Sequence, residues 1–209
     1  MKRTLATIAA MAGICTSSAA RADSTPSEGA MRDAAARHGV PLGVLYAVGL
    51  TETGKRGSLQ PFALNIDGRA FFGRSAADAV AQFEAARSKG ARFIDLGCMQ
   101  INHHFHGRKF PSLAAMLDPL RNVDYATGFL KELKQREGSW TMAVARYNAG
   151  PNNNPAQKRY ICRVVANMVA SGFGTWTPGA SAFCSGDPSS TRASAPAGIR
   201  LAADHQARP

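Results

Sequence analysis

Residues 45–54 read Leu45-Tyr46-Ala47-Val48-Gly49-Leu50-Thr51-Glu52-Thr53-Gly54. An apolar run that ends in a carboxylate predicts a buried helix whose last turn carries an acid. Leu45, Val48 and Glu52 are spaced i, i+3 and i+7, so they share one face of that helix. Because the face is otherwise apolar, we expect the carboxyl of Glu52 to be drawn toward the core.

The predicted position of Glu52 has a chemical consequence. Burial disfavours the charged form of a carboxyl, and the negative end of the helix dipole acts in the same direction, so both effects raise its pKa. A glutamate whose pKa is raised to about 6–7 can hold a proton near neutral pH and donate it as a general acid. The alternative is a solvated glutamate at a helix end, followed by Gly54 as the helix cap.

Around this helix, the pattern predicts one α-rich domain over residues 28–184, of α+β class and mostly α, with a small β-hairpin insertion. Asp67-Gly68 separates two short apolar runs, 62–66 and 69–72, which is typical of a β-hairpin. A third short strand is expected at 92–95. Further helices are predicted at 31–38, 75–90, 112–117, 120–136, 139–148 and 155–171.

The two ends of the chain differ from the predicted domain. Residues 1–22 combine a basic start, a short apolar run and the small-x-small sequence Ala20-Arg21-Ala22, which predicts a secretory signal peptide and a periplasmic location. A lipid anchor at Cys15 is disfavoured because Ile14 is bulkier than the small residue such sites have. Residues 185–209 are rich in Ser, Ala, Gly and Pro, and we expect a disordered tail there.

The charge balance restricts the partners. The chain has 25 Lys and Arg against 14 Asp and Glu, a net charge of +11; loss of Lys2, Arg3 and Arg21 with the signal peptide lowers it to +8. A basic exported protein suits an anionic polymer of the cell envelope. Nucleic acid is not an expected partner, because the charge is scattered and no stripe of basic and aromatic residues is present.

Three cysteines remain after the predicted cleavage: Cys98, Cys162 and Cys184. An exported protein can form disulfides, so one bridge and one free thiol is the simplest arrangement. We favour Cys162–Cys184, which would fasten the end of the domain, although spacing alone does not fix the pairing. Cys98 is expected to be a small buried apolar residue.

Three separated segments remain to be explained together: Glu52-Thr53-Gly54, Gly97-Cys98-Met99-Gln100-Ile101-Asn102 and Ala145-Arg146-Tyr147-Asn148-Ala149-Gly150. In this order they resemble the soluble lytic transglycosylases of the goose-type lysozyme superfamily, over about residues 38–170. That family has Glu followed by Ser or Thr, then Gly-Leu-Met-Gln-Ile, then Ala-Tyr-Asn-Ala-Gly. Cys98 in place of Leu and Arg146 in place of Ala depart from the pattern without removing a group that the chemistry needs.

The resemblance implies a lysozyme-like fold and cleavage of the β-1,4 bond between N-acetylmuramic acid and N-acetylglucosamine, leaving a 1,6-anhydro sugar. It implies Glu52 as the single catalytic residue, first acid and then base, with no cofactor and no metal. The alternatives are a hydrolytic muramidase of the lysozyme type and a non-catalytic peptidoglycan-binding accessory protein. The long stretch between the first two segments is similar to small members attached to secretion or flagellar systems, so such an apparatus is a candidate partner of a monomeric enzyme.

Four further residues are predicted to bind substrate. Gln100 offers an amide donor and acceptor for sugar hydroxyls or an N-acetyl group. Tyr147 combines an apolar ring with a hydroxyl; the alternative is a core tyrosine whose hydroxyl binds the backbone. Asn148 is expected to shape the site, and Met99, together with Ile101, to form its wall and the adjoining core.

Other polar residues near the motifs have structural interpretations. Asp67 lies in the hairpin, where a lysozyme would place its second carboxylate, but Asp-Gly is first of all a turn pair. Asp95 is interpreted as a structural loop acid. The histidines His103, His104 and His106 are expected to form a solvated loop rather than a zinc site, because no Cys or carboxylate lies at ligand spacing.

Overall fold

The computed structural model describes residues 26–186, so the predicted signal peptide and nearly all of the predicted tail lie outside the described residues. The helices of this part are α1 (Pro26–His38), α2 (Leu42–Thr53), α3 (Ala76–Ser88), α4 (His103–His106), η1 (Gly107–Lys109), α5 (Leu113–Leu117), α6 (Pro119–Glu137), α7 (Trp140–Asn148), α8 (Asn154–Ala170) and α9 (Pro178–Cys184). The strands are β1 (Ala63–Ile66), β2 (Arg69–Phe72), β3 (Ile94–Leu96) and β4 (Ile101–Asn102).

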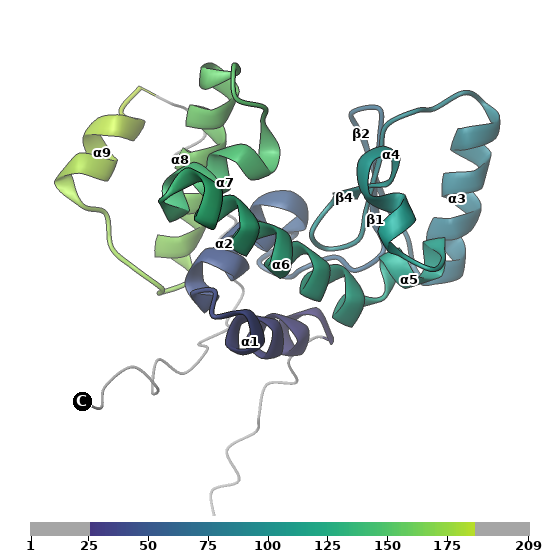
Figure 1. Cartoon of the computed structure of the whole chain (residues 1–209). Coiled ribbons are helices and arrows are strands. Elements are labelled where there is room, and N and C mark those ends of the chain that lie inside the picture. The colour runs from purple at the N-terminus through teal and green to yellow at the C-terminus, as the bar shows by residue number, and fades with distance from the viewer. Residues whose placement is uncertain (1–25, 187–209) are drawn as a thin grey trace, which may run out of the picture.

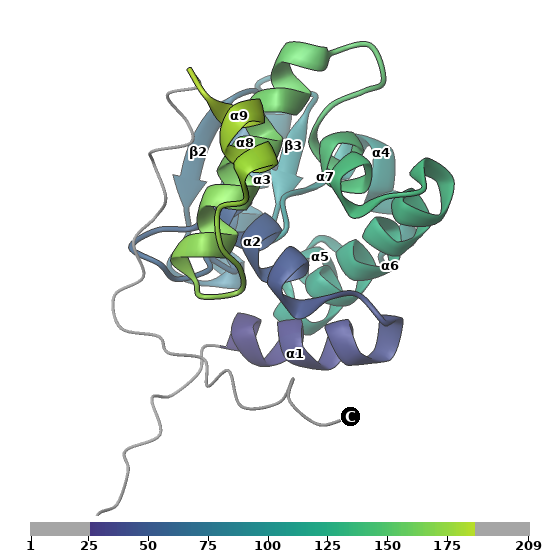
Figure 2. The ribbon, with the colours of Figure 1, turned by 90° about the vertical axis from the view of Figure 1, so that its left-hand side faces the viewer.

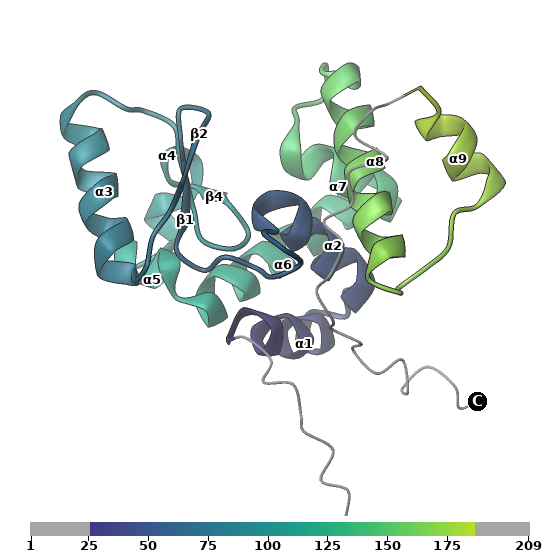
Figure 3. The same ribbon diagram turned by 180° about the vertical axis from the view of Figure 1, so that it is seen from behind.

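The elements fall into two groups joined by α2 and α6. Figures 1 and 3 show the sheet with α3 and α5 at one end of the molecule and α7, α8 and α9 at the other. Helix α1 packs across α6, and α2 packs against α8. Figure 2, seen from the α9 side, shows α8 and α9 in front of the strands. The prediction of an α+β, mostly helical, lysozyme-like fold is confirmed.

Helix α2 lies in the centre of the core. Its residues 45–50 are all buried, and Leu45, Ala47 and Val48 have no exposed surface. A helix that is apolar on every side must be covered on every side, so α1, α8 and the segment around Met99 pack around it. Polar residues begin in the last turn of α2, where Thr51 and Glu52 follow this apolar stretch.

The four strands form one antiparallel sheet in the order β2-β1-β3-β4. Ile66 pairs with Arg69 across the turn Asp67-Gly68, whose φ angles are 46° and 88°. A two-residue turn with both φ angles positive matches the twist of the flanking strands, which is why Asp-Gly is found there. The predicted hairpin is therefore confirmed, whereas strand β4, only two residues long, was not predicted.

The predicted helices are present, with two differences at the ends of the domain. Helix α1 begins at Pro26, five residues before the predicted start at Met31, because the polar residues of its first turn pack inward and Ser27 and Glu28 are buried. Helix α9 was not predicted; it is held by the Thr177 cap and by Cys184, neither of which gives a helical periodicity. Within residues 26–186, no helix is both long and apolar enough to cross a membrane.

A disulfide joins Cys162 on α8 to Cys184 at the end of α9, as favoured from the sequence, and Cys98 is a free, fully buried thiol. The bridge closes a loop across a sequence separation of 22. We expect the double substitution Cys162→Ala/Cys184→Ala to lower the free energy of unfolding by about 3 kcal/mol, because the unfolded chain regains the entropy of that loop. Urea denaturation of the oxidised wild type and of the variant would measure the difference. Equal midpoints would contradict the prediction.

Candidate active site

The last turn of α2 carries Glu52 to the edge of the core. Thr51 and Thr53 on either side of it are tied down: the Thr51 hydroxyl donates to the Ala47 carbonyl at 2.7 Å, and the Thr53 hydroxyl donates to the Cys98 carbonyl at 2.9 Å. The second of these bonds joins the end of α2 to the segment 97–102. The backbone that carries the carboxyl is therefore fixed from two directions.

Helix α8 supplies the direct partner of the carboxyl. The hydroxyl of Tyr160 donates a hydrogen bond of 2.5 Å to Oε1 of Glu52, and the Tyr160 side chain is 1 % exposed. About two helical turns further along α8, the Asn167 amide donates to the hydroxyl of Thr51 at 2.9 Å. Burial, followed by the nearby Glu52 carboxylate, keeps the pKa of Tyr160 well above its ordinary value, so its hydroxyl remains a donor.

The surroundings of Glu52 raise the pKa of its carboxyl from 4.5 to about 7. Burial is the largest cause. The Tyr160 hydrogen bond and the positive charge of Arg163 act against it by stabilising the carboxylate, and the negative charge of Asp95 acts with it. The sequence-based expectation of a raised pKa is confirmed, and the carboxyl can exist in both protonation states near neutral pH.

Removing the Tyr160 hydroxyl tests this balance of effects. That hydroxyl stabilises the charged carboxylate, so Tyr160→Phe should raise the pKa of Glu52 further. For a reaction that needs protonated Glu52, the alkaline limb of the pH profile of kcat/KM should move to higher pH. Tyr125→Phe is the matched control, because its hydroxyl binds His106 instead of Glu52. An unchanged limb in Tyr160→Phe would contradict the assignment.

The segment 97–102 takes an unusual backbone path beside Glu52. Gly97 has φ 80° and Gln100 has φ 49°, both in the left-handed region. A Cβ on Gly97 would also overlap the side-chain amide of Asn122, so only glycine fits. The left-handed conformation at Gln100 is supported by its own side chain, whose amide nitrogen donates to the carbonyls of Gly97 at 2.9 Å and Ala63 at 3.4 Å.

The fully buried side chain of Asn122 on α6 holds this segment in place. Its amide nitrogen donates to the carbonyls of Leu96 at 3.0 Å and Met116 at 2.8 Å, and its oxygen accepts from the Met99 amide at 2.9 Å. Three of these hydrogen bonds are therefore to backbone groups, and the Asn122 oxygen also accepts a longer one of 3.5 Å from the thiol of Cys98. Asn122 thus fixes the position of residues 96–99, and with them the neighbouring Gln100.

The side chain of Tyr147 is hydrogen-bonded to the backbone of Met99. The Tyr147 hydroxyl donates to the Met99 carbonyl at 2.7 Å, and its half-buried ring contacts Phe129 at 5.9 Å. This is the alternative described from the sequence, a tyrosine whose hydroxyl binds the backbone. The Met99 side chain is 0 % exposed, which corrects the prediction that it contacts substrate: it packs beneath α2, and only its carbonyl takes part in the site.

Asn148 is exposed at the end of α7, beside a pocket of about 260 Å³. The pocket is lined by Asn148, Ala156, Arg159, Tyr160 and Arg163. Tyr160 therefore both donates to the Glu52 carboxyl and belongs to the lining of this pocket. The structure places Asn148 near Tyr160, in keeping with the predicted role of shaping the site.

Asp95 on β3 is the second acid of the site. Its two oxygens accept hydrogen bonds from Asn102 at 2.6 Å and Asn65 at 3.0 Å, and burial, the largest effect, raises its pKa. Its charge reaches Glu52, whose pKa it helps to raise. It belongs to a strand and not to a loop, and it is held by neighbouring strands on both sides.

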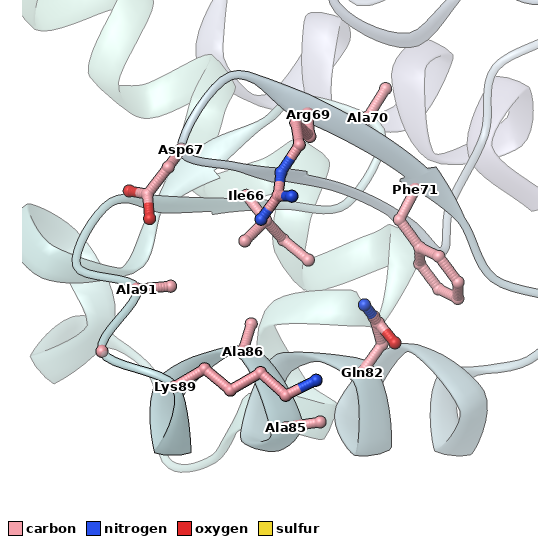
Figure 4. A pocket seen from close by; sticks show the side chains of 11 residues that line it. Ile66, Asp67, Arg69, Ala70, Phe71, Gln82, Ala85, Ala86, Lys89 and Ala91 are labelled. Atoms are coloured by element: carbon pink, nitrogen blue, oxygen red, sulfur yellow. The ribbon is translucent and has the colours of Figure 1, made fainter.

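Asp67 lies in a different part of the sheet. It occupies the hairpin turn, where its carboxylate accepts a bond from the Phe93 amide at 3.1 Å. Figure 4 shows it at the rim of a pocket of about 490 Å³ between the hairpin and α3. Ala63, at the opposite end of β1, is the residue that contacts Gln100, so Asp67 lies roughly 13 Å further along the strand. The structure does not bring Asp67 together with Glu52.

The histidines after β4 make aromatic and polar contacts. His106 shares a hydrogen bond of 2.8 Å with the Tyr125 hydroxyl, and His103 packs edge-on against Phe83 at 4.8 Å. Among residues 26–186, no group of three or more His, Cys, Asp or Glu side chains is arranged to hold a metal ion.

Three features of the site do not follow from the sequence patterns: Tyr160, Asn122 and the effect of Asp95 on Glu52. Tyr160 is 108 residues from Glu52, and it lies in a helix whose pattern indicates only burial. Asn122 is a polar residue inside the apolar face of α6, and that interruption of the periodicity was the one local signal available.

The comparisons with known proteins give one match. A family model described as "Transglycosylase SLT domain" matches residues 30–162. The matched segment contains Glu52, Asp95, Gln100, Tyr147 and Tyr160, and it ends before α9. No curated protein and no solved structure matches the chain.

Proposed function

The chain belongs to the transglycosylase SLT domain family, whose members act on peptidoglycan as lytic transglycosylases. We propose that it cleaves the β-1,4 bond between N-acetylmuramic acid and N-acetylglucosamine, and that Glu52 is its single catalytic residue. The observation that carries the proposal is the carboxyl of Glu52, half-buried at the end of α2, hydrogen-bonded to Tyr160 and with a pKa of about 7.

The proposed reaction uses both protonation states of Glu52. The protonated carboxyl donates its proton to the glycosidic oxygen, the bond from that oxygen to C1 of the muramic acid breaks, and N-acetylglucosamine leaves with a new 4-hydroxyl. The carboxylate then takes the proton from the 6-hydroxyl of the muramic acid, whose oxygen bonds to C1 and closes the 1,6-anhydro ring. No water is consumed, and Glu52 ends the cycle protonated.

The neighbours of Glu52 have supporting roles in the proposal. Tyr160 holds the carboxyl in one orientation and stabilises the carboxylate formed after the first proton transfer. The amide nitrogen of Gln100 is engaged with backbone, and the described residues give its side-chain oxygen no donor, so that oxygen is available to a sugar hydroxyl or N-acetyl group. Tyr147 offers its partly exposed ring and Asn148 its exposed amide.

A second candidate is hydrolysis of the lysozyme type, and Asp95 is the observation that favours it. Two-carboxylate glycosidases need a second acid near the first, and the negative charge of Asp95 is close enough to raise the pKa of Glu52. In that reaction water would be consumed and a reducing end formed. We favour the transglycosylase, because Asp95 is already bonded through both oxygens to Asn65 and Asn102.

The products separate the two candidates. Purified protein acting on sacculi should release 1,6-anhydromuropeptides, lighter by one water than the hydrolysis products and distinguishable by mass. Asp95→Asn should retain this product while the alkaline limb of its pH profile moves to lower pH, because a charge that raises the pKa of Glu52 has been removed. Reducing-end products that disappear in Asp95→Asn would instead establish hydrolysis.

The place of action is also a proposal. The basic start, apolar run and small-x-small sequence within residues 1–22 support export, and peptidoglycan is the substrate available there. We infer a periplasmic monomer that serves a secretion or flagellar apparatus by opening the wall locally. Fractionation of cells with an antibody against the chain tests the location, and recovery only from the cytoplasm would overturn it.

A further inference from the structure

A row of ring contacts leads away from the candidate active site. The ring of Tyr147 contacts Phe129 at 5.9 Å, Phe129 contacts His106 at 5.2 Å, and His106 contacts Phe105 at 6.5 Å. Phe105 then stacks on Phe93 with ring centroids 6.0 Å apart and an angle of 27° between the planes. One continuous row is thus formed by side chains from α7, α6 and α4 and by Phe93, the residue before β3.

The outer end of this row is open to solvent. The side chains of Phe105 and Phe93 are 69 % and 45 % exposed, and the ring of His104 packs against both, at 4.9 and 5.2 Å. We call Phe93, His104 and Phe105 the aromatic shelf. Large aromatic side chains that are exposed side by side are typical of a binding surface, since their faces can stack on a flat, partly apolar ligand.

A pocket of about 340 Å³ lies beside the aromatic shelf, and His104 belongs to both. The pocket, here named the basic pocket, is lined by Arg87, Arg92, His103, His104, Gly107 and Arg108. Among the described residues that line it, none is acidic. The planar guanidinium groups of arginine match the geometry of a carboxylate, with which they form paired, charge-assisted hydrogen bonds.

We propose that the aromatic shelf and the basic pocket form an outlying binding site for a peptidoglycan strand, with a sugar ring on the shelf and a carboxylate of the stem peptide in the pocket. The inference rests on the proposed function, because it takes the strand held at Glu52 as the ligand. The row of ring contacts from Tyr147 to Phe105 connects the candidate active site with the aromatic shelf.

The chemistry of both surfaces selects this ligand over simpler ones. An uncharged glycan would stack on the shelf and leave the basic pocket without a partner. A phosphate polymer that lacks sugar rings would fill the pocket and leave the shelf without a partner. Peptidoglycan carries sugar rings with apolar faces and, on alternate sugars, peptides with carboxylates, so it uses both surfaces together.

Binding by the full mature chain carrying Glu52→Gln, which prevents cleavage, tests the site. The probes are uncross-linked peptidoglycan strands, an N-acetylglucosamine hexamer and inorganic phosphate. Phe105→Ala should weaken binding of the strands about tenfold. Arg92→Gln/Arg108→Gln should weaken binding of the strands about tenfold at low salt, with a smaller effect at high salt, and leave the uncharged hexamer within about twofold.

Matched controls separate this effect from a general loss of aromatic surface or charge. Phe183→Ala removes a phenylalanine that is 46 % exposed on α9, at the other end of the molecule from the sheet (Figure 1), and Arg32→Gln/Lys131→Gln removes two exposed charges elsewhere. Both should bind the strands as the parent does. Equal losses in the controls would overturn the proposal, as would inorganic phosphate displacing the strands from the basic pocket while Phe105→Ala has no effect.

Failure of the outlying binding site can be distinguished from failure of the proposed cleavage reaction. If the wild type releases 1,6-anhydro products while the shelf and pocket variants bind strands normally, the outlying site is wrong and the reaction stands. If the strands bind through these side chains but the wild type cleaves nothing, the binding site stands and the reaction fails. In the active enzyme, the same substitutions should raise KM for long strands and leave kcat unchanged.

Discussion

Replacing Glu52 with Gln should lower the rate of glycan cleavage by about 10³- to 10⁴-fold, because one group supplies both the acid and the base of the reaction. The amide can still accept the hydrogen bond from Tyr160, so the geometry of the site should persist. Release of 1,6-anhydromuropeptides from sacculi, followed by mass over time, measures the loss. Lysis at the wild-type rate would show that Glu52 is not the catalytic acid and would favour a non-catalytic accessory protein.

The same substitution should stabilise the protein at high pH. The pKa of Glu52 is about 7 in the folded chain against an ordinary 4.5, so between these values the folded state binds more protons than the unfolded state. The free energy of unfolding of the wild type therefore falls as the pH rises from 4.5 to 7, by up to about 3 kcal/mol. Gln has no charge to bury, so the stability of Glu52→Gln should lack this fall. Urea denaturation at pH 4.5 and pH 8 would test it.

Asp67→Asn is the matched control for Glu52→Gln. It makes the same change from carboxylate to amide in the hairpin turn, and the new side-chain oxygen can still accept the bond from the Phe93 amide. Its activity should stay within about twofold of the wild type, because the turn lies away from the Glu52 carboxyl. A large loss of activity in Asp67→Asn would give Asp67 a role in the reaction that its place in the structure does not support.

Replacing Asn122 with Leu should lower the free energy of unfolding by about 3–5 kcal/mol. The near-isosteric side chain removes the hydrogen bonds that Asn122 makes with the buried carbonyls of Leu96 and Met116 and the amide of Met99, and each buried group left unsatisfied costs about 1–3 kcal/mol. A loss of this size is a large part of the stability of an ordinary domain. Activity should fall as well at temperatures where the variant is folded, because the segment that carries Gln100 is no longer fixed.

Thr127→Val is the control for Asn122→Leu. It is also a change from a buried polar side chain to an apolar isostere on α6, but the Thr127 hydroxyl binds only the Val123 carbonyl of its own helix. The expected cost is about 1 kcal/mol or less, since that carbonyl keeps its helical partner. Thermal and urea unfolding of both variants would make the comparison. Equal losses would mean that burial of any polar group on α6, and not the hydrogen bonds of Asn122, sets the stability.

Most of the fold could be predicted from short-range patterns. The hairpin follows from a turn pair between two apolar runs, and α6 from apolar residues at helical spacing between its Asp118 cap and Gly138. The predictions failed where the signal was short or absent. Strand β4 has two residues, and α9 depends on a disulfide to a helix that precedes it in the chain.

The candidate site could be predicted only in part. Glu52 and Gln100 were identified because they stand in recognisable segments, and the structure brings these segments together through the Thr53 bond to the Cys98 carbonyl. Met99 was assigned to the substrate and belongs to the core, because a motif does not show which of its side chains point inward. Asp95 was interpreted as a loop acid and lies within electrostatic reach of Glu52.

The sequence by itself determined that an apolar helix ends in an acid, and that a glycine-containing segment and a tyrosine accompany it. These features depend on periodicity, caps and turns, which act over a few residues. Only the tertiary structure decided what surrounds that acid: Tyr160 from α8 on its oxygen, Asp95 within reach, and Asn122 behind the segment that carries Gln100. A carboxyl takes its pKa from burial and from neighbouring groups in space, and those groups come from distant parts of the chain.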